Sequence, residues 1–446
     1  MLKLLCKLWI VLALAVGGMV PLGDGGTPLL AGAALADDDD DDDDARDDDD
    51  DDRVIRRARP RIRQAPPPRV ARIPRPGRAP DEIVAPRLEQ QDFQSLLDQG
   101  FTLIEAYQRP DDSIARRLRI PEGSTLPAAR QAVRDLPTGQ QADFNHYYRT
   151  EQAATVTRTA ATSLPACRGK HCADRRLIGW SHDTARVQSC LGDVTIGLID
   201  TGLNEDHATF GRAELDVIRL TPERQEPSQA IHGTAVAALL IGDPASRSPG
   251  LVPGARVIAV DAFYRVRGDE RADVFTLIKG LTQLAENGAD VINLSLAGPP
   301  NTALKQAIDR LTREENIIII AAVGNAGAKA RPLFPAAYGQ VIGVTAVDRE
   351  LRVYRRAVNG AHVDLAAPGV DVWTAASISG IRPKTGTSFA VPFVTAAVAM
   401  LRGQNPDLTG AQALRILAAE ARDLGEPGRD PVFGAGLIST ASVCAG

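Results

Sequence analysis

Continuous apolar stretches alternate with segments of helical spacing over the second half of this chain, and this alternation restricts the fold more than any other feature. The expected strands are residues 193–198, 256–263, 290–296, 316–323 and 340–347, and the expected helices are residues 235–241, 273–286, 302–315, 389–402 and 409–423. Strands that are apolar throughout are buried on both faces, and the helices that connect them cover those faces. The pattern therefore predicts an α/β fold with a mostly parallel sheet between helices.

The first 36 residues have the three parts of a secretory signal peptide. Lys3 and Lys7 precede an apolar run, and the segment ends in Ala34-Leu35-Ala36, a small-x-small cleavage site. The apolar run is short for a membrane span, which needs about 20 residues. We expect cleavage after Ala36 and export to the periplasm or the extracellular space, and an uncleaved anchor is the alternative.

Residues 37–87 consist of an aspartate run followed by a segment dominated by arginine and proline. Neither part has enough apolar content to offset the entropy of ordering, so we expect this stretch to be disordered or extended. Aspartates bind calcium only where a loop preorganises them, and an Arg-Pro segment could contact nucleic acid or a membrane. Two blocks of opposite charge that screen each other are the simpler interpretation. We expect no nucleic-acid partner, and membrane contact only during export.

Residues 88–150 are typical of a small α+β unit, with strands expected at 101–107, 117–120 and 143–148 and a helix at 126–136. A unit of about 60 residues is only marginally stable by itself. Such a unit between a signal peptide and a large domain suits a pro-segment, and a permanent N-terminal domain is the alternative. Residues 151–176 are expected to be a linker, and residues 177–446 the large domain.

Four of the five cysteines follow the predicted signal peptide: Cys167, Cys172, Cys190 and Cys444. An even number in an exported chain fits two disulfides, which can form in three pairings. Cys167 and Cys172 flank His171, but no second well-spaced pair completes a metal site. We expect two disulfides and no metal bound by these residues.

Ser388 lies in Gly386-Thr387-Ser388, directly before an alanine-rich segment, and we expect it in the first turn of a buried helix. A hydroxyl there caps the free amides, or acts as a nucleophile whose oxyanion those amides stabilise. Asp200 ends an expected strand, His232 precedes a helix and Asn325 follows another strand. Each of these alone is more often a turn or loop residue. Together they supply nucleophile, base, orienting carboxylate and amide donor at the ends of elements in an α/β pattern.

Five motifs make the chain resemble the subtilisin-like serine proteases, the subtilase family. The motifs are Ile199-Asp200-Thr201-Gly202, His232-Gly233-Thr234, Asn293-Leu294-Ser295-Leu296, Ala322-Val323-Gly324-Asn325 and Gly386-Thr387-Ser388-Phe389-Ala390-Val391-Pro392. The order Asp, His, Ser is that of subtilisin. The resemblance covers about residues 177–446. It implies a three-layer subtilisin-like fold and a pro-segment that assists folding and inhibits the enzyme, which fits residues 88–150.

The resemblance also implies a role for each residue of the site. His232 takes the proton of Ser388 as the hydroxyl attacks the scissile carbonyl, and Asp200 orients the imidazole. Asn325 and the Ser388 amide stabilise the oxyanion. The substrate backbone is expected to pair with Ser295, Leu296 and Ala297 as an added strand.

The remaining substrate-binding residues expected from the family are Val323, Gly324 and Leu333. Many relatives have glycine at the place of Leu333, so we expect a shallower pocket that favours small or medium apolar side chains before the cleaved bond. The resemblance also matches Phe334-Pro335 to an aromatic-proline step that tends to be cis in the family.

The chemistry requires no cofactor and no catalytic metal. The acidic residue of the strongest calcium site of the family is replaced by Thr209, so the sequence gives no clear motif for structural calcium and leaves calcium dependence open. We expect a monomer that acts on protein or peptide substrates.

Three other classes of function fit the sequence less well. An aspartic protease also uses Asp-Thr-Gly, but it needs two such carboxylates and this chain has one. An inactive binding module would have lost a catalytic residue, and a disulfide-linked structural protein would not explain the motifs. The sequence therefore predicts a secreted serine endopeptidase that cleaves off its own pro-segment.

Overall fold

The computed structural model describes residues 75–150, 169–222 and 225–444. The predicted signal peptide, the aspartate run and most of the predicted linker lie outside these residues. Within the described ranges, none of the helices is both long enough and apolar enough to cross a membrane.

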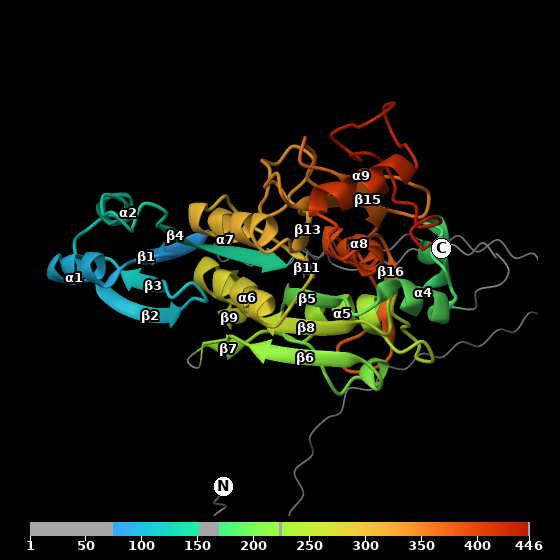
Figure 1. The fold of residues 1–446 in the computed structure, drawn as a ribbon, viewed down its shortest axis with the longest axis horizontal. Coiled ribbons are helices and arrows are strands. Elements are labelled where there is room, and N and C mark those ends of the chain that lie inside the picture. Colours follow the sequence, from blue (N-terminus) through green and yellow to red (C-terminus); the bar gives the residue numbers. More distant parts are fainter. Residues whose placement is uncertain (1–74, 151–168, 223–224, 445–446) are drawn as a thin grey trace, which may run out of the picture. The chain divides into compact units, whose positions relative to one another are not determined.

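A seven-stranded sheet forms the centre of the large domain (Figure 1). Its strands, in spatial order, are β15 (Leu365–Pro368), β14 (Ile342–Val347), β13 (Ile318–Ala322), β11 (Val291–Leu294), β5 (Thr195–Asp200), β8 (Arg256–Asp261) and β6 (Glu214–Arg219). Every neighbouring pair is parallel. The predicted parallel sheet is confirmed.

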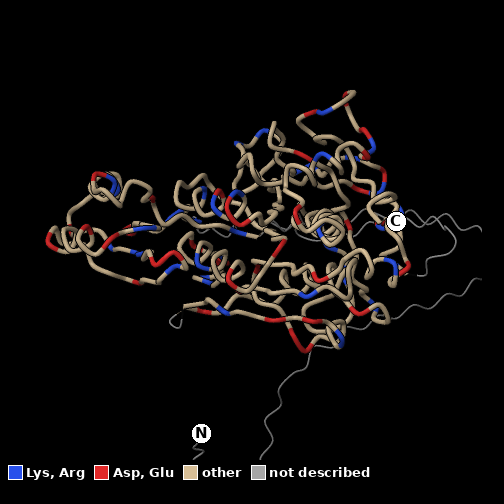
Figure 2. The backbone as a smooth tube through the Cα atoms, in the orientation of Figure 1, with Lys and Arg blue, Asp and Glu red and all other residues tan. Residues whose placement is uncertain are grey.

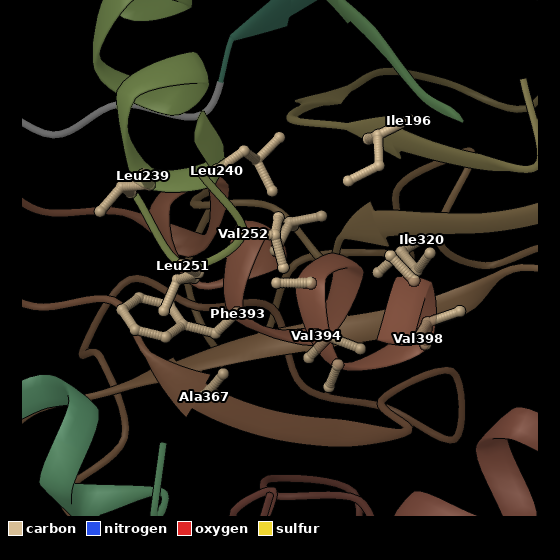
Figure 3. Close-up of a cluster of buried hydrophobic side chains, with 14 of the residues drawn as sticks. Ile196, Leu239, Leu240, Leu251, Val252, Ile320, Ala367, Phe393, Val394 and Val398 are labelled. Atoms are coloured by element: carbon tan, nitrogen blue, oxygen red, sulfur yellow. The ribbon is translucent and has the colours of Figure 1, made fainter. Parts of the chain in front are cut away.

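Helices cover both faces of this sheet. One core cluster contains residues of α4 (Thr184–Leu191), α5 (His232–Ile241), α8 (Val391–Gln404) and α9 (Gly410–Glu420), and another contains residues of α6 (Val274–Glu286) and α7 (Thr302–Arg313). Figure 3 shows Phe393, Val394 and Val398 of α8 beside Ile320 of the sheet and Val252. Fully burying one such side chain stabilises the fold by about 1.5–3 kcal/mol. Because helices pack on both faces of the sheet, the predicted three-layer arrangement is confirmed.

Residues 75–150 form part of a second, eight-stranded sheet. Its main path runs β2 (Thr102–Gln108), β3 (Ile114–Arg119), β1 (Arg78–Ala85), β4 (Asp143–Thr150), β10 (Asp269–Asp273), β9 (Tyr264–Val266) and β7 (Glu226–Pro227), and β12 (Leu296–Ala297) also pairs with β4. Two helices, α1 (Gln90–Asp98) and α2 (Leu126–Arg134), belong to the same region. β4 runs between α6 and α7 (Figure 1), and it pairs with β10 and β12 of the large domain.

The prediction that residues 37–87 lack folded structure is wrong for residues 78–85, which form β1. Ile83, Val84 and Ala85 are fully buried. The charge of Glu82 in the same strand is compensated, because Arg117 Nε donates to Glu82 Oε2 over 2.8 Å. Pairing with distant strands thus orders a segment whose own composition favours disorder.

Short elements complete the described part of the chain. They are α3 (Cys172–Leu177), the 3₁₀ turns η1 (Ala208–Phe210) and η2 (Thr387–Phe389), and the hairpin of β16 (Val372–Ala375) and β17 (Ile381–Lys384). Acidic and basic residues are interspersed along the backbone (Figure 2).

One of the two predicted disulfides is present between Cys190 of α4 and Cys444. Cys172 is disulfide-bonded as well. Its partner lies outside the described residues. Cys167, the fourth cysteine of the prediction, also lies outside the described residues.

Candidate active site

Asp200 and His232 meet at the carboxyl edge of the central sheet. Asp200 is the last residue of β5 and His232 is the first residue of α5. His232 Nδ1 donates to Asp200 Oδ1 over 2.6 Å, and both side chains are only 2% exposed. The same carboxylate oxygen accepts from the Thr201 amide over 2.7 Å. Burial in a low-dielectric site strengthens these bonds, so Asp200 fixes the orientation and tautomer of the imidazole.

Thr201 connects the loops that carry Asp200 and His232. Its Oγ1 accepts from the Gly233 amide over 2.9 Å. A Cβ at Gly233 would lie 2.3 Å from the Thr201 carbonyl oxygen, so only glycine allows this approach. Thr201 and Gly233 stand inside family motifs, but this contact was not predictable from the sequence, because it depends on how two separate loops meet.

Ser388 lies in η2, the 3₁₀ turn that precedes α8, and not in the first turn of the helix as predicted. Its Oγ donates to the Ser295 carbonyl over 3.0 Å. The His232 ring lies 5.2 Å from the ring of Phe389, so the imidazole packs beside the same turn. Within the described ranges, no hydrogen-bond partner of His232 Nε2 is found. Proton transfer from Ser388 to His232 therefore requires the hydroxyl to rotate away from Ser295.

The amide of Asn325 is oriented by Thr387. Asn325 Oδ1 accepts from the Thr387 amide and from Thr387 Oγ1, each over 3.1 Å. Because these bonds fix the carbonyl oxygen, the NH₂ group is the end that can donate to an oxyanion. Thr387 Oγ1 also accepts from the Gly324 amide over 3.2 Å. Thr387 was missed as a functional residue, although it stands inside a motif that identified the family.

An extended strand lies along Leu296 and Ala297, two of the residues predicted to pair with the substrate backbone. The strand is β4 of the same chain, and its antiparallel register pairs Leu296 with Thr150 and Ala297 with Arg149. β10 pairs with the other side of β4. This second edge was not predicted, because the residues of β10, Asp-Glu-Arg-Ala-Asp, have no strand-like pattern.

The predicted pocket residues Val323, Gly324 and Leu333 come together behind this edge. Val323 is fully buried. A Cβ at Gly324 would lie 2.5 Å from Leu333 Cδ1, so the Leu333 side chain occupies the space next to this glycine. The Phe334-Pro335 peptide bond is cis, as expected from the resemblance.

The profile of the subtilase family matches residues 192–436, more than half of the chain. The chain belongs to the subtilase family. Subtilisin DY from Bacillus licheniformis is 31% identical over 267 residues, which cover 58% of this chain and 93% of that protein. Subtilisin BL from Lederbergia lenta is 30% identical over 248 residues, or 55% of this chain and 88% of that protein. The subtilase identified here is accordingly a serine-type endopeptidase that acts on protein or peptide substrates.

Fervidolysin from Fervidobacterium pennivorans, described as a keratinolytic enzyme related to subtilisin, has a similar fold. The TM-score is 0.69 at 19% identity, and the match covers 84% of this chain and 62% of that structure. At this identity the likeness concerns the fold alone. The structural match to fervidolysin thus covers more of this chain, 84%, than the sequence match to subtilisin DY, 58%.

Two further carboxyl groups lie near Asp200 in this subtilase. Asp261 is in register with Asp200 on the neighbouring strand β8. Burial raises the pKa of Asp261 to about 6, and the negative charge of Asp200 also raises it. Burial likewise raises the pKa of Glu270, with Asp200 again adding to the effect. The site therefore contains more negative charge than Asp200 alone supplies.

The described part of the subtilase contains no group of three or more His, Cys, Asp or Glu side chains arranged to hold a metal ion. Thr209, at the place of the family's calcium-binding acid, is engaged in the protein's own hydrogen bonds. Its Oγ1 lies 2.9 Å from Ser246 Oγ and donates to the Ser248 carbonyl over 2.9 Å.

Proposed function

We propose that this subtilase is an exported zymogen whose triad of Asp200, His232 and Ser388 cleaves its own N-terminal segment. The observation that carries the proposal is β4, which lies as an antiparallel strand on Leu296 and Ala297, where a substrate is expected to lie. The buried 2.6 Å bond between His232 and Asp200 supports the catalytic part. The pro-segment begins before residue 88, because β1 belongs to the same sheet.

In the proposed mechanism, Ser388 Oγ attacks the scissile carbonyl carbon while His232 takes its proton. The carbonyl oxygen becomes an oxyanion, which the Asn325 side-chain amide and the Ser388 backbone amide stabilise. His232 then gives the proton to the leaving amine, and the C–N bond breaks to leave an acyl-enzyme. Water attacks the ester with His232 as base, which releases the acid and restores Ser388.

Three contacts support the role of residues 78–150 as an intramolecular inhibitor. Tyr148 of β4 is fully buried, and its Oη donates to the Pro299 carbonyl over 2.8 Å. Asp143 Oδ2 accepts from the Thr302 amide at the start of α7 over 2.8 Å. Arg149 Nη2 donates to Asp269 Oδ2 over 2.7 Å. A strand held in this way excludes any other peptide from the same edge.

Export to the periplasm or the extracellular space is supported by two observations. The signal-peptide pattern of residues 1–36 precedes the folded region, and Cys190 and Cys444 form a disulfide, which persists in oxidising compartments. The proposed enzyme acts as a monomer. The position of Leu333 beside Gly324 supports a shallow pocket for small or medium apolar side chains, and a peptide-library profile dominated by large aromatic residues at that site would contradict it.

A fluorophosphonate probe tests the catalytic assignment, because it reacts with an activated serine. The exported protein is labelled, digested and mapped by mass spectrometry, with Ser388→Ala and His232→Ala treated in parallel. We expect one adduct, on the peptide that contains Ser388, and none in either variant. Labelling elsewhere, or undiminished labelling of His232→Ala, would contradict the proposed triad.

A further inference from the structure

A cavity of about 230 Å³ lies where the N-terminal region meets α6 and α7. Arg109 comes from the N-terminal region and Arg310 from α7, and these two arginines line the cavity together with two others, Arg87 and Arg313. Neither the triad nor the substrate-binding edge contributes to it. Its lining comes from both regions, so the cavity exists only while the N-terminal region stays on the large domain. A molecule bound in the cavity would therefore change the stability of the contact between the two regions.

Most acidic groups at this cavity already have a cation of their own. Asp111 accepts from Arg87 over 2.6 Å. Asp309 accepts from Lys305 over 2.5 Å. Glu314 is the third acidic residue of the lining, and its neighbour Glu315, outside the lining, accepts from Arg310 Nη1. The shortest ion-pair distance of Arg109 is 3.7 Å, to Asp111, which Arg87 already contacts more closely.

Two buried guanidinium N–H groups at the cavity have no acceptor. The Arg109 side chain is only 9% exposed, and its Nη1 donates to the Pro86 carbonyl over 3.1 Å. The Nε atoms of both Arg109 and Arg310 are buried with no hydrogen-bond partner found among the described residues. Buried polar groups are almost always hydrogen-bonded, so these donors indicate a missing acceptor.

Of these two arginines, Arg310 is paired with Glu315, whereas the nearest carboxylate to Arg109 among the described residues, that of Asp111, lies 3.7 Å away, so the charge of Arg109 is only partly compensated. Burial lowers the pKa of Arg109, and the charge of Arg310 lowers it further, against the opposite effect of Asp111. Several water molecules fit in the cavity, at about 30 Å³ each, and would satisfy the N–H groups without compensating the charge. A tetrahedral oxyanion does both, because its oxygens accept charge-assisted bonds from guanidinium groups. Phosphate, which keeps a proton at neutral pH, can also donate, which suits Gln306 Oε1 and Asp309 Oδ1, two lining atoms for which the described residues supply no hydrogen-bond partner.

We propose that this cavity binds a small oxyanion, such as phosphate or sulfate, through Arg109 and Arg310. Because these residues belong to opposite sides of the contact, the bound oxyanion holds the N-terminal region against α7. A ligand that binds only the associated form stabilises that form. The inference concerns binding and does not rest on the proposed proteolytic maturation.

The test uses the full-length chain with Ser388→Ala, whose intact mass is checked first. The midpoint of thermal unfolding is measured against increasing sodium phosphate or sodium sulfate, with sodium chloride at equal ionic strength as reference. We expect a saturable rise of roughly 2–4 °C with either oxyanion. Adding Arg109→Gln should abolish the rise. Adding Arg119→Gln, which removes the same charge at an exposed site of the N-terminal region, should preserve it.

Three results would overturn the proposal. They are no rise above chloride, an equal rise in the Arg109→Gln and Arg119→Gln chains, and a rise that grows linearly without saturation, which indicates general exclusion of the salt from the protein surface. If Arg109→Gln does not fold, Arg313→Gln replaces it, because Arg313 is exposed on α7. That variant should weaken the apparent affinity severalfold, and an unchanged affinity would count against the site.

Discussion

The side-chain carbonyl oxygen of Asn325 accepts two hydrogen bonds from Thr387, so the side-chain NH₂ group is the end that can donate to an oxyanion. Removing one such donor costs a factor of about 10²–10³ in kcat. We expect Asn325→Leu to lose activity by this factor with little change in KM, because the donor acts on charge that develops in the transition state. Steady-state kinetics on a peptide substrate measures both constants.

Thr387→Val is the matched control for Asn325→Leu. It removes one of the two bonds to Asn325 Oδ1, together with the acceptor of the Gly324 amide, and leaves the backbone bond to Asn325 in place, so we expect a smaller fall in kcat. Unchanged kcat in Asn325→Leu, or a larger loss in Thr387→Val, would contradict the assigned orientation.

Burial of Asp261 makes the folded state less stable as the pH rises. Its pKa is raised to about 6 by burial and by Asp200, above the value of about 3.9 in an unfolded chain. The folded state therefore holds this proton more tightly, and the stabilisation is complete below about pH 4 and is lost as pH rises through 6. We expect Asp261→Asn to remove this loss and to raise stability at pH 7 by up to roughly 3 kcal/mol.

Urea unfolding of the Ser388→Ala chain between pH 4 and pH 8 measures this effect. Ser228 Oγ donates to Asp261 Oδ1 over 3.0 Å, and the side-chain amide of the Asp261→Asn variant keeps a carbonyl oxygen that can accept this bond. Asp216→Asn, on the exposed side of β6, is the control and should leave the pH dependence as it is. Equal pH slopes in Asp261→Asn and its parent would contradict the prediction.

At the scale of elements, β4 owes much of its attachment to one side chain, Tyr148. The phenol bonds to the Pro299 carbonyl, and a Cβ at Gly298 would lie only 2.5 Å from the ring. We expect Tyr148→Phe to cost about 0.5–1.5 kcal/mol through the lost hydrogen bond. Tyr148→Ala should cost about 3–5 kcal/mol because it also empties the space of the ring.

The free energy of unfolding in urea, again in the Ser388→Ala chain, checks both values. Tyr147→Phe is the control at the next position of the strand, because no hydrogen bond of its hydroxyl is found within the described ranges. A Tyr148→Phe chain as stable as the Tyr147→Phe chain would show that the Pro299 contact contributes nothing.

The elements that the sequence predicted best are those with the strongest local signal. β13 and α7 lie inside the predicted ranges 316–323 and 302–315, because continuous apolar character and helical spacing are properties of the segment itself. β1 and β10 were missed, because their charged residues form strands only through pairing with other strands, β1 with β3 and β4 and β10 with β4 and β9. These two strands are formed by tertiary contacts and not by a local sequence pattern.

The same distinction holds for the site. Asp200, His232, Asn325 and Ser388 were predicted because short motifs carry them. The bonds from Thr387 to Asn325 and from Ser388 to Ser295 were not, because they depend on the approach of η2 to the ends of β11 and β13. Fold and chemistry were thus predictable, whereas the contacts that orient each group required the structure.

At the scale of the whole molecule, the disulfide between Cys190 and Cys444 closes a loop of 254 residues and ties α4 to the end of the described chain. Arg186 strengthens the same attachment, because its Nη2 donates to the Cys444 carbonyl over 2.6 Å. We expect the double variant Cys190→Ala, Cys444→Ala to lose about 2–5 kcal/mol of stability. Unfolding in urea without reductant measures the loss, and an equally stable variant would contradict the prediction.

The central claim is that the chain cleaves off the N-terminal strand that occupies its own substrate edge. Intact-mass spectrometry of the exported wild type and of Ser388→Ala, side by side, tests it most directly. We predict that the wild type lacks the residues before roughly position 177 and that Ser388→Ala retains residues 78–150. If both proteins have the same length, the chain does not process itself, and residues 78–150 are either removed by another protease or are a permanent part of the enzyme.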